Sequence, residues 1–145
     1  MWGFLIACIS GALMSIQGVF NTGVTKQTGI WVTNSFVQFT GFLVCALFWL
    51  FKERSEVSVM ELPKIENKYM LLGGVMGAFI TYTVIKSMEG LGPATAVLAI
   101  VIAQVLVAYL IELFGLFEVE KVAFSVSKLF GILIAIAGLV IFKWE

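Results

Sequence analysis

The sequence predicts an all-α integral membrane protein with five transmembrane helices, and two features of the chain support this. Of its 145 residues, 61% are hydrophobic and only 12% are charged, whereas a soluble domain carries about 25% charged residues. The apolar residues fall in five runs, and a helix needs roughly 20 such residues to cross a hydrocarbon core of about 30 Å. We expect helices at about 3–20, 30–51, 69–88, 93–116 and 124–143, which form a single transmembrane domain over residues 1–145.

Composition also excludes several classes of function. The formal net charge is zero and there is no His, so no basic surface for nucleic acid is expected. Cys8 and Cys45 lie within apolar runs and are interpreted as small packing residues. With no His to act as a base or metal ligand, and no phosphate-binding glycine loop, we expect neither an enzyme, nor a metal site, nor a cofactor.

The 93–116 segment is the longest apolar run. Pro93 suits a first helical position because its missing N–H would lack an intrahelical partner there. Gln104 is the only strongly polar side chain in the eighteen residues that follow, and it shares a face with Ala108 and Glu112. Two interpretations of Glu112 stay open: an interfacial residue that reaches headgroups or the loop of Lys121, or a site for a proton or cation.

The first two segments each carry a narrow polar face. Spacings of i, i+4, i+7 and i+11 relate Ser10, Met14, Gln17 and Asn21 in 3–20, and Asn34, Gln38, Gly41 and Cys45 in 30–51. Such residues share one side of a helix. Their amides either hydrogen-bond neighbouring helices as structural contacts or line a polar cavity.

Small residues form stripes on the later segments, where they allow helices to approach closely. We predict helix-packing or dimer contacts at Gly73, Gly77, Gly131, Ala135 and Gly138. The hydrophilic stretch 52–68 holds eight of the eighteen charged residues, mixed in sign, and is interpreted as a solvated loop.

Five spans place the two termini on opposite sides of the membrane. Six Lys and Arg residues fall on the N-terminal side and three on the other, which favours an inside N-terminus and an outside C-terminus. This bias is small enough to permit insertion in both orientations. Since no internal repeat supplies a second half, an inverted copy of the chain would recreate an inverted-repeat transporter.

Several short motifs recur in one order over some 120 residues. They are Gln17-x-x-x-Asn21, Gly73-Gly74, Gly77-Ala78, Leu91-Gly92-Pro93-Ala94, Ala103-Gln104, Phe114-Gly115-Leu116, Gly131 and Gly138. With these motifs the chain resembles the YdcZ-like family of the drug/metabolite transporter (DMT) superfamily. At Glu112 this family often has Asp, so the charge is retained.

The resemblance implies a five-helix half-transporter of the bacterial cytoplasmic (inner) membrane. Members of this branch occur as single chains, paired genes and fused ten-helix proteins, which fits an antiparallel dimer. The related small multidrug resistance transporters use a membrane-embedded Glu in their first helix. The 3–20 segment contains no acid, so the resemblance does not extend to that residue.

The leading hypothesis is a secondary transporter of a small organic solute that works by alternating access as an antiparallel homodimer. The predicted substrate-binding residues are the amides Gln17, Asn21, Asn34, Gln38 and Gln104. Glu112 is the predicted coupling residue. The expected partners are the lipid bilayer, a second copy of the chain and an unidentified small solute. The alternatives are a non-transporting assembly or regulatory subunit, and one half of a heterodimeric transporter.

Overall fold

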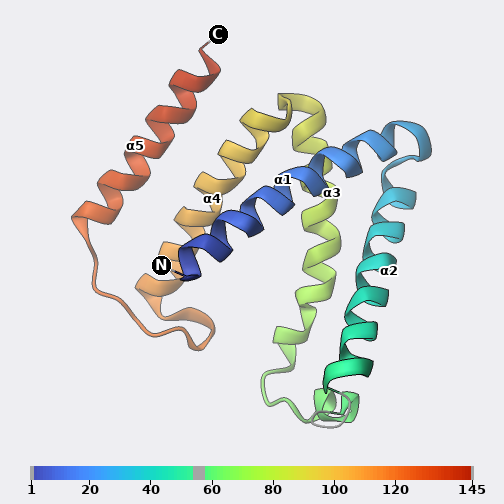
Figure 1. The fold of residues 1–145 in the computed structure, drawn as a ribbon. Coiled ribbons are helices and arrows are strands. Elements are labelled where there is room, and N and C mark those ends of the chain that lie inside the picture. Colours follow the sequence, from blue (N-terminus) through green and yellow to red (C-terminus); the bar gives the residue numbers. More distant parts are fainter. Residues whose placement is uncertain (1, 54–57, 145) are drawn as a thin grey trace. The chain divides into compact units, whose positions relative to one another are not determined.

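The computed structural model describes residues 2–53 and 58–144, and the described part is almost entirely helical. Five long helices follow one another along the chain (Figure 1): α1 (Trp2–Thr28), α2 (Ile30–Phe48), α3 (Gly73–Leu91), α4 (Pro93–Phe114) and α5 (Val126–Lys143). All five are long and apolar enough to cross a membrane. The spans that contain α2 and α3 also include the short helical turns next to them, Ile30–Lys52 and Lys68–Leu91. The predicted class, an all-α membrane protein with five spans, is confirmed.

Close contacts divide the chain into two compact units, residues 1–86 and 87–145. The first unit contains α1, α2 and most of α3, and the second contains α4 and α5. The single domain expected over residues 1–145 stays a prediction.

Two single glycines separate consecutive long helices. Gly29 lies between α1 and α2 with φ 88° and ψ 156°, and Gly92 lies between α3 and α4 with φ 77° and ψ 158°. This backbone region is open almost only to glycine. In both turns the glycine N–H donates to the carbonyl four residues earlier, and its own carbonyl accepts from the N–H four residues later. The N–H and C=O groups of both glycines are therefore hydrogen-bonded.

The first helix is longer than predicted. A connection was expected over residues 21–29, but α1 continues to Thr28. The hydroxyls of Thr22 and Thr28 donate to the carbonyls of Gly18 and Val24, at 2.8 and 3.1 Å. These polar side chains are thus satisfied within the helix, and a run rich in Thr and Gly does not require a loop.

The other helix ends lie within a few residues of the predicted ones. A π-helical turn, Trp49–Glu53, continues α2, and 3₁₀ turns occupy Val59–Lys64 and Lys68–Leu72. Gly115 ends α4 in the left-handed conformation (φ 64°, ψ 41°), two residues before the predicted end. A short 3₁₀ turn, Leu116–Glu118, follows it. Ser125 then caps α5 by accepting the Lys128 N–H, so the helix starts two residues later than predicted.

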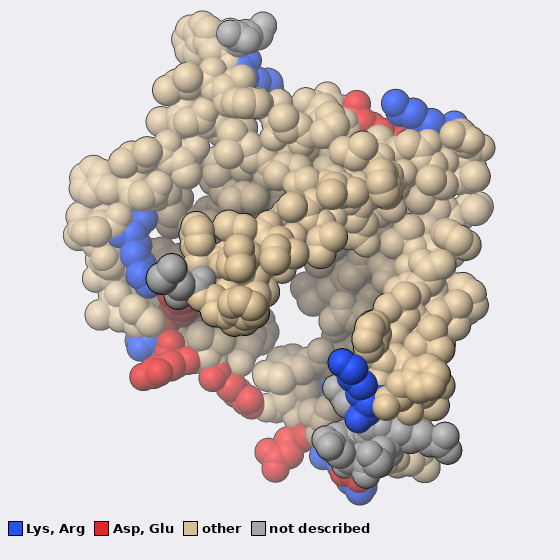
Figure 2. Space-filling model, viewed as in Figure 1, with Lys and Arg blue, Asp and Glu red and all other residues tan. Residues whose placement is uncertain are grey.

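Most of the helix surface is left uncovered by the chain itself. Only 6–11% of each candidate span is buried. Charged side chains gather in a few groups, and most of the visible surface carries none (Figure 2). Uncovered apolar surface of this extent is expected where lipid or another protein chain is the neighbour.

Candidate functional site

The two amides of α2 both bond to α3 within the first unit. The Asn34 amide nitrogen donates to the Ala78 carbonyl at 2.8 Å, and that of Gln38 donates to the Thr81 hydroxyl at 3.3 Å. Thr81 in turn donates to the Gly77 carbonyl at 3.0 Å. The i, i+4 spacing of the amides therefore creates a polar seam between α2 and α3.

The same seam has further side-chain contacts at two levels. A Cβ added at Gly77 would lie 3.7 Å from the Gln38 amide nitrogen, whereas one at Gly73 would meet nothing within 4 Å. Nearer the Gly29 turn, the rings of Trp31 and Tyr82 stack with their centroids 5.1 Å apart. Small and aromatic residues thus hold the two helices together around the amides.

Buried polar atoms gather near the junction of α1 and α2. Asn21 and Thr25 on α1 are each 8% exposed, and Asn34 on α2 is 3% exposed. The Thr25 hydroxyl and the Asn34 carbonyl oxygen are buried without a hydrogen-bond partner in the described part of the chain. Buried polar groups normally have a partner, so these two side-chain oxygens mark a place in the first unit where a hydrogen bond is missing, although both atoms are enclosed by the chain in this conformation.

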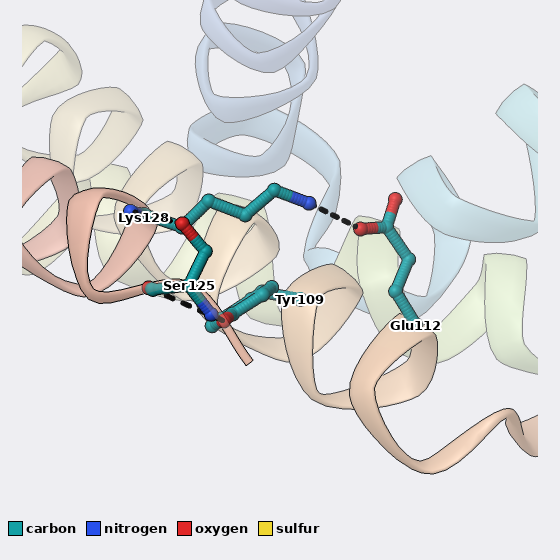
Figure 3. A network of polar contacts seen from close by, with 4 residues as sticks. All are labelled: Tyr109, Glu112, Ser125 and Lys128. Atoms are coloured by element: carbon teal, nitrogen blue, oxygen red, sulfur yellow. Dashed lines mark hydrogen bonds and ion pairs between the residues drawn. The ribbon is translucent and has the colours of Figure 1, made fainter. Parts of the chain in front are cut away.

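A second polar cluster joins α4 to the start of α5 in the other unit (Figure 3). Lys128 Nζ lies 3.1 Å from a carboxylate oxygen of Glu112 and 5.1 Å from the centre of the Tyr109 ring. The Tyr109 hydroxyl accepts the Ser125 N–H at 2.8 Å and lies 3.4 Å from the Ser125 carbonyl. The carboxylate, cation and phenol thus form one network between the two helices.

This network lies at one end of a pocket of about 430 Å³ between α4 and α5. Apart from the three polar residues, the lining is apolar or small: Val101, Ile102, Val105, Ala108, Gly131, Ile132 and Ala135. Ligand sites are commonly apolar pockets with a few convergent polar groups. The second unit therefore holds a binding pocket with a charged end and an apolar body.

The chain matches one protein-family model over residues 2–141, and that family is described as "Putative inner membrane exporter, YdcZ". The protein belongs to the YdcZ family. It is an integral protein of the inner membrane. Neither among the curated proteins nor among the solved structures is there a match to the chain.

In this YdcZ-family protein, four of the five predicted substrate-binding amides lie in the first unit, and Gln104 lies in the second. The structure brings Asn34 and Gln38 together on one seam. Gln17 and Gln104 are exposed and make no side-chain hydrogen bond within the described residues. Asn21 is buried.

Glu112 has an ion-pair partner that neither sequence interpretation named. Its carboxylate pairs with Lys128 and not with Lys121, while its backbone carbonyl accepts the Val122 N–H from the loop at 3.0 Å. The loop thus reaches the backbone of Glu112, and the start of α5 reaches its side chain. Its role in coupling stays a prediction.

Sequence reasoning missed Tyr109 and Lys128 as site residues. Tyr109 precedes Glu112 by three residues, a spacing that places both on one helix face. Lys128 lies in the first turn of α5, where the positive end of the helix dipole disfavours a cation. These two signals together would have suggested an acidic partner for Lys128.

The small residues predicted for helix packing divide between the units. Gly131 and Ala135 line the pocket, and a Cβ added at Gly131 or Gly138 would meet nothing within 4 Å. Within the described chain this face of α5 is therefore open, and its use in a dimer stays a prediction.

Proposed function

We propose that this YdcZ-family protein exports a small organic solute across the inner membrane by alternating access, as an antiparallel homodimer. The observation that supports this best is the buried carbonyl oxygen of Asn34, which has no partner in the described chain. Leaving such a group unbonded costs about 1–3 kcal/mol, and the hydrocarbon core offers no water to satisfy it. Because the oxygen is enclosed in this conformation, a solute with N–H or O–H donors would reach it, and remove this cost, in another state of the alternating-access cycle.

The amides are the recognition groups in this proposal. Asn34 and Gln38 present a seam fixed by bonds to α3, and Thr25 adds a second unbonded oxygen in the same unit. Gln17, Asn21 and Gln104 would complete the site. Because these groups are neutral, binding would depend on hydrogen bonds more than on charge.

A second, inverted copy supplies the neighbours that one chain lacks. Gln17 and Gln104 are exposed, and a polar side chain that faces hydrocarbon is costly, so protein or a water-filled cavity is expected to cover it. The six-to-three distribution of basic residues permits both orientations. An antiparallel pair would double the amide set around one axis, as inverted repeats do in other transporters.

Glu112 is the proposed coupling residue. A proton or another cation would take the place of Lys128 beside its carboxylate, and the 3.1 Å pair would then open. Since this pair joins α4 to α5, its opening would alter the contact between these helices. Ion coupling would thus act on helix packing.

Flux into proteoliposomes from a panel of small metabolites tests the proposal. We expect a pH or ion gradient to drive uptake of at least one solute, and Gln17→Ala, Asn34→Ala and Gln104→Ala each to lower its rate. Glu112→Gln should remove the dependence on the gradient. Unchanged transport in both Gln17→Ala and Gln104→Ala would show that the proposed site is wrong.

The second candidate is a non-transporting assembly or regulatory subunit, and the α2–α3 seam is the observation that favours it. Interhelical hydrogen bonds of this kind contribute about 0.6–2 kcal/mol each. In this case amide variants would lose thermal stability in detergent, and no metabolite would show flux. Copurification of a different chain from the native membrane would instead indicate a heterodimer.

A further inference from the structure

The pocket between α4 and α5 is about as long as the hydrocarbon layer of one membrane leaflet is thick, and, like a lipid molecule, it is polar at one end and apolar along the rest. Its α4 wall runs from Val101 to Glu112, a rise of about 16 Å at 1.5 Å per residue. That is close to half of a hydrocarbon core of about 30 Å. The polar residues lie at the end near the loop, and the apolar ones continue toward the middle of the helix.

The pocket is open at its side as well as at its polar end. Val101 and Val105 line it and are 45% and 51% exposed. On α5, Lys128, Gly131 and Ala135 follow the same groove, and the small side chains of the last two leave it wide. A long apolar chain therefore fits along the groove and can enter from the bilayer.

The polar end offers opposite charges side by side. Glu112 uses one carboxylate oxygen for Lys128, and its other oxygen has no hydrogen bond in the described chain. Lys128 has three N–H donors, of which one faces Glu112 while the ammonium lies over the Tyr109 ring. A carboxylate oxygen and ammonium donors are thus both available to a ligand.

We propose that this groove binds a zwitterionic phospholipid with a primary ammonium headgroup, such as phosphatidylethanolamine. The ammonium lies against Glu112, the phosphate lies against Lys128 at the positive end of α5, and one acyl chain follows Val105 and Val101 toward the bilayer centre. Basic pockets between transmembrane helices bind lipid headgroups through their phosphates. Here the adjacent carboxylate selects a headgroup that also carries a cation.

This lipid site does not depend on the transport proposal. An ammonium headgroup and a proton are alternative cations for one carboxylate, so both uses of Glu112 are compatible. Lipid binding is measured without a gradient or a transported solute, so failure of either proposal leaves the other standing.

Native mass spectrometry of the delipidated, detergent-solubilised protein tests the site. The probes are phosphatidylethanolamine and phosphatidylglycerol with identical acyl chains, since the second keeps the phosphate and lacks the ammonium. We expect the first bound molecule of phosphatidylethanolamine to have a dissociation constant about tenfold lower than that of phosphatidylglycerol, because it makes one additional charged hydrogen bond. Equal affinity for the two lipids would overturn the proposal.

Variants locate the binding to the groove. Glu112→Gln should abolish the preference between the lipids, Lys128→Met should weaken both, and Ala108→Phe should fill the groove and prevent binding. Glu120→Gln and Lys121→Met remove matched charges outside the pocket and should bind as the unmodified protein does. If the preference survives Glu112→Gln, or the control variants lose it equally, the assignment is wrong.

Two further measurements test whether a variant has misfolded and whether the site binds a soluble molecule instead of a lipid. Glu112→Lys combined with Lys128→Glu keeps the ion pair, so it should fold and regain the preference that Glu112→Lys alone removes. Free phosphoethanolamine should not displace the lipid at concentrations where the lysolipid does. Equal displacement by both would mean that the site recognises a soluble zwitterion, and the lipid assignment would fail.

Discussion

At the residue scale, Asn34 uses the two ends of its amide differently. Its nitrogen bonds to the Ala78 carbonyl, and its oxygen is buried without a partner. The first contact is structural, and the second is the strongest sign of a ligand in the first unit. A single substitution removes both, so stability and transport have to be measured together.

We predict that Asn34→Ala lowers the unfolding free energy by about 0.6–2 kcal/mol, the range for an interhelical hydrogen bond in a membrane. Unfolding in mixed micelles, followed by circular dichroism, measures this change. Gln17→Ala is the matched control, because its amide makes no hydrogen bond in the described chain. Equal losses from both substitutions would contradict the structural role of the Asn34 bond.

Tyr109 supports a second residue-scale prediction. In Tyr109→Phe the ring beside Lys128 remains, but the Ser125 N–H loses its acceptor at 2.8 Å. We expect a loss of about 0.5–1.5 kcal/mol, the net contribution of a typical hydrogen bond, in the same unfolding assay, because Ser125 is only partly buried. Tyr82→Phe keeps its ring stack with Trp31 and should change stability far less.

At the element scale, two similar glycine turns determine where one long helix ends and the next begins. Gly29 and Gly92 adopt nearly the same backbone angles and make the same two backbone bonds. In the first case a segment that contains Thr22, Thr25 and Thr28 continues the helix up to the turn. In the second, Glu89 and Gly90 remain helical and Pro93 starts the next helix.

Gly29→Ala and Gly92→Ala should each cost about 1–3 kcal/mol, because a Cβ strains this backbone conformation. The thermal midpoint of the detergent-solubilised protein measures the effect. Gly41→Ala is the control, since Gly41 lies inside α2 and a Cβ there meets nothing within 4 Å. If Gly41→Ala were as harmful as the two turn substitutions, lost helix contacts and not backbone strain would be the cause.

At the scale of the whole molecule, the proposed antiparallel assembly depends on the small charge bias, because only a small bias permits both orientations. If the active form is an antiparallel homodimer, reporters fused to the C-terminus should give signals from both sides of the membrane. A signal from one side alone would instead favour a parallel assembly or an oppositely oriented partner chain.

Fixing the orientation should abolish transport by a homodimer. Lys26→Gln with Lys143→Gln leaves one basic residue of three on the C-terminal side and should hold the N-terminus inside. An oppositely biased chain neutralises five residues of the other side, Lys52, Arg54, Lys64, Lys68 and Lys121, which leaves Lys128 alone against three. Each chain alone should lose flux, and coexpression should restore it. Full flux from either fixed chain would exclude the antiparallel arrangement.

The sequence by itself determined the class, the five spans and the family, because hydrophobic run length and helical spacing are local properties of a chain in a bilayer. It also placed the amides of α2 on one face, and the structure shows that face bonded to α3. Only the tertiary structure decided which residue meets Glu112. Lys121 is nearer in sequence, but Ser125 caps α5 and Tyr109 holds that cap, and together they bring Lys128 to the carboxylate. A long-range pairing of this kind depends on how two helices pack, so spacing along one helix could not reveal it.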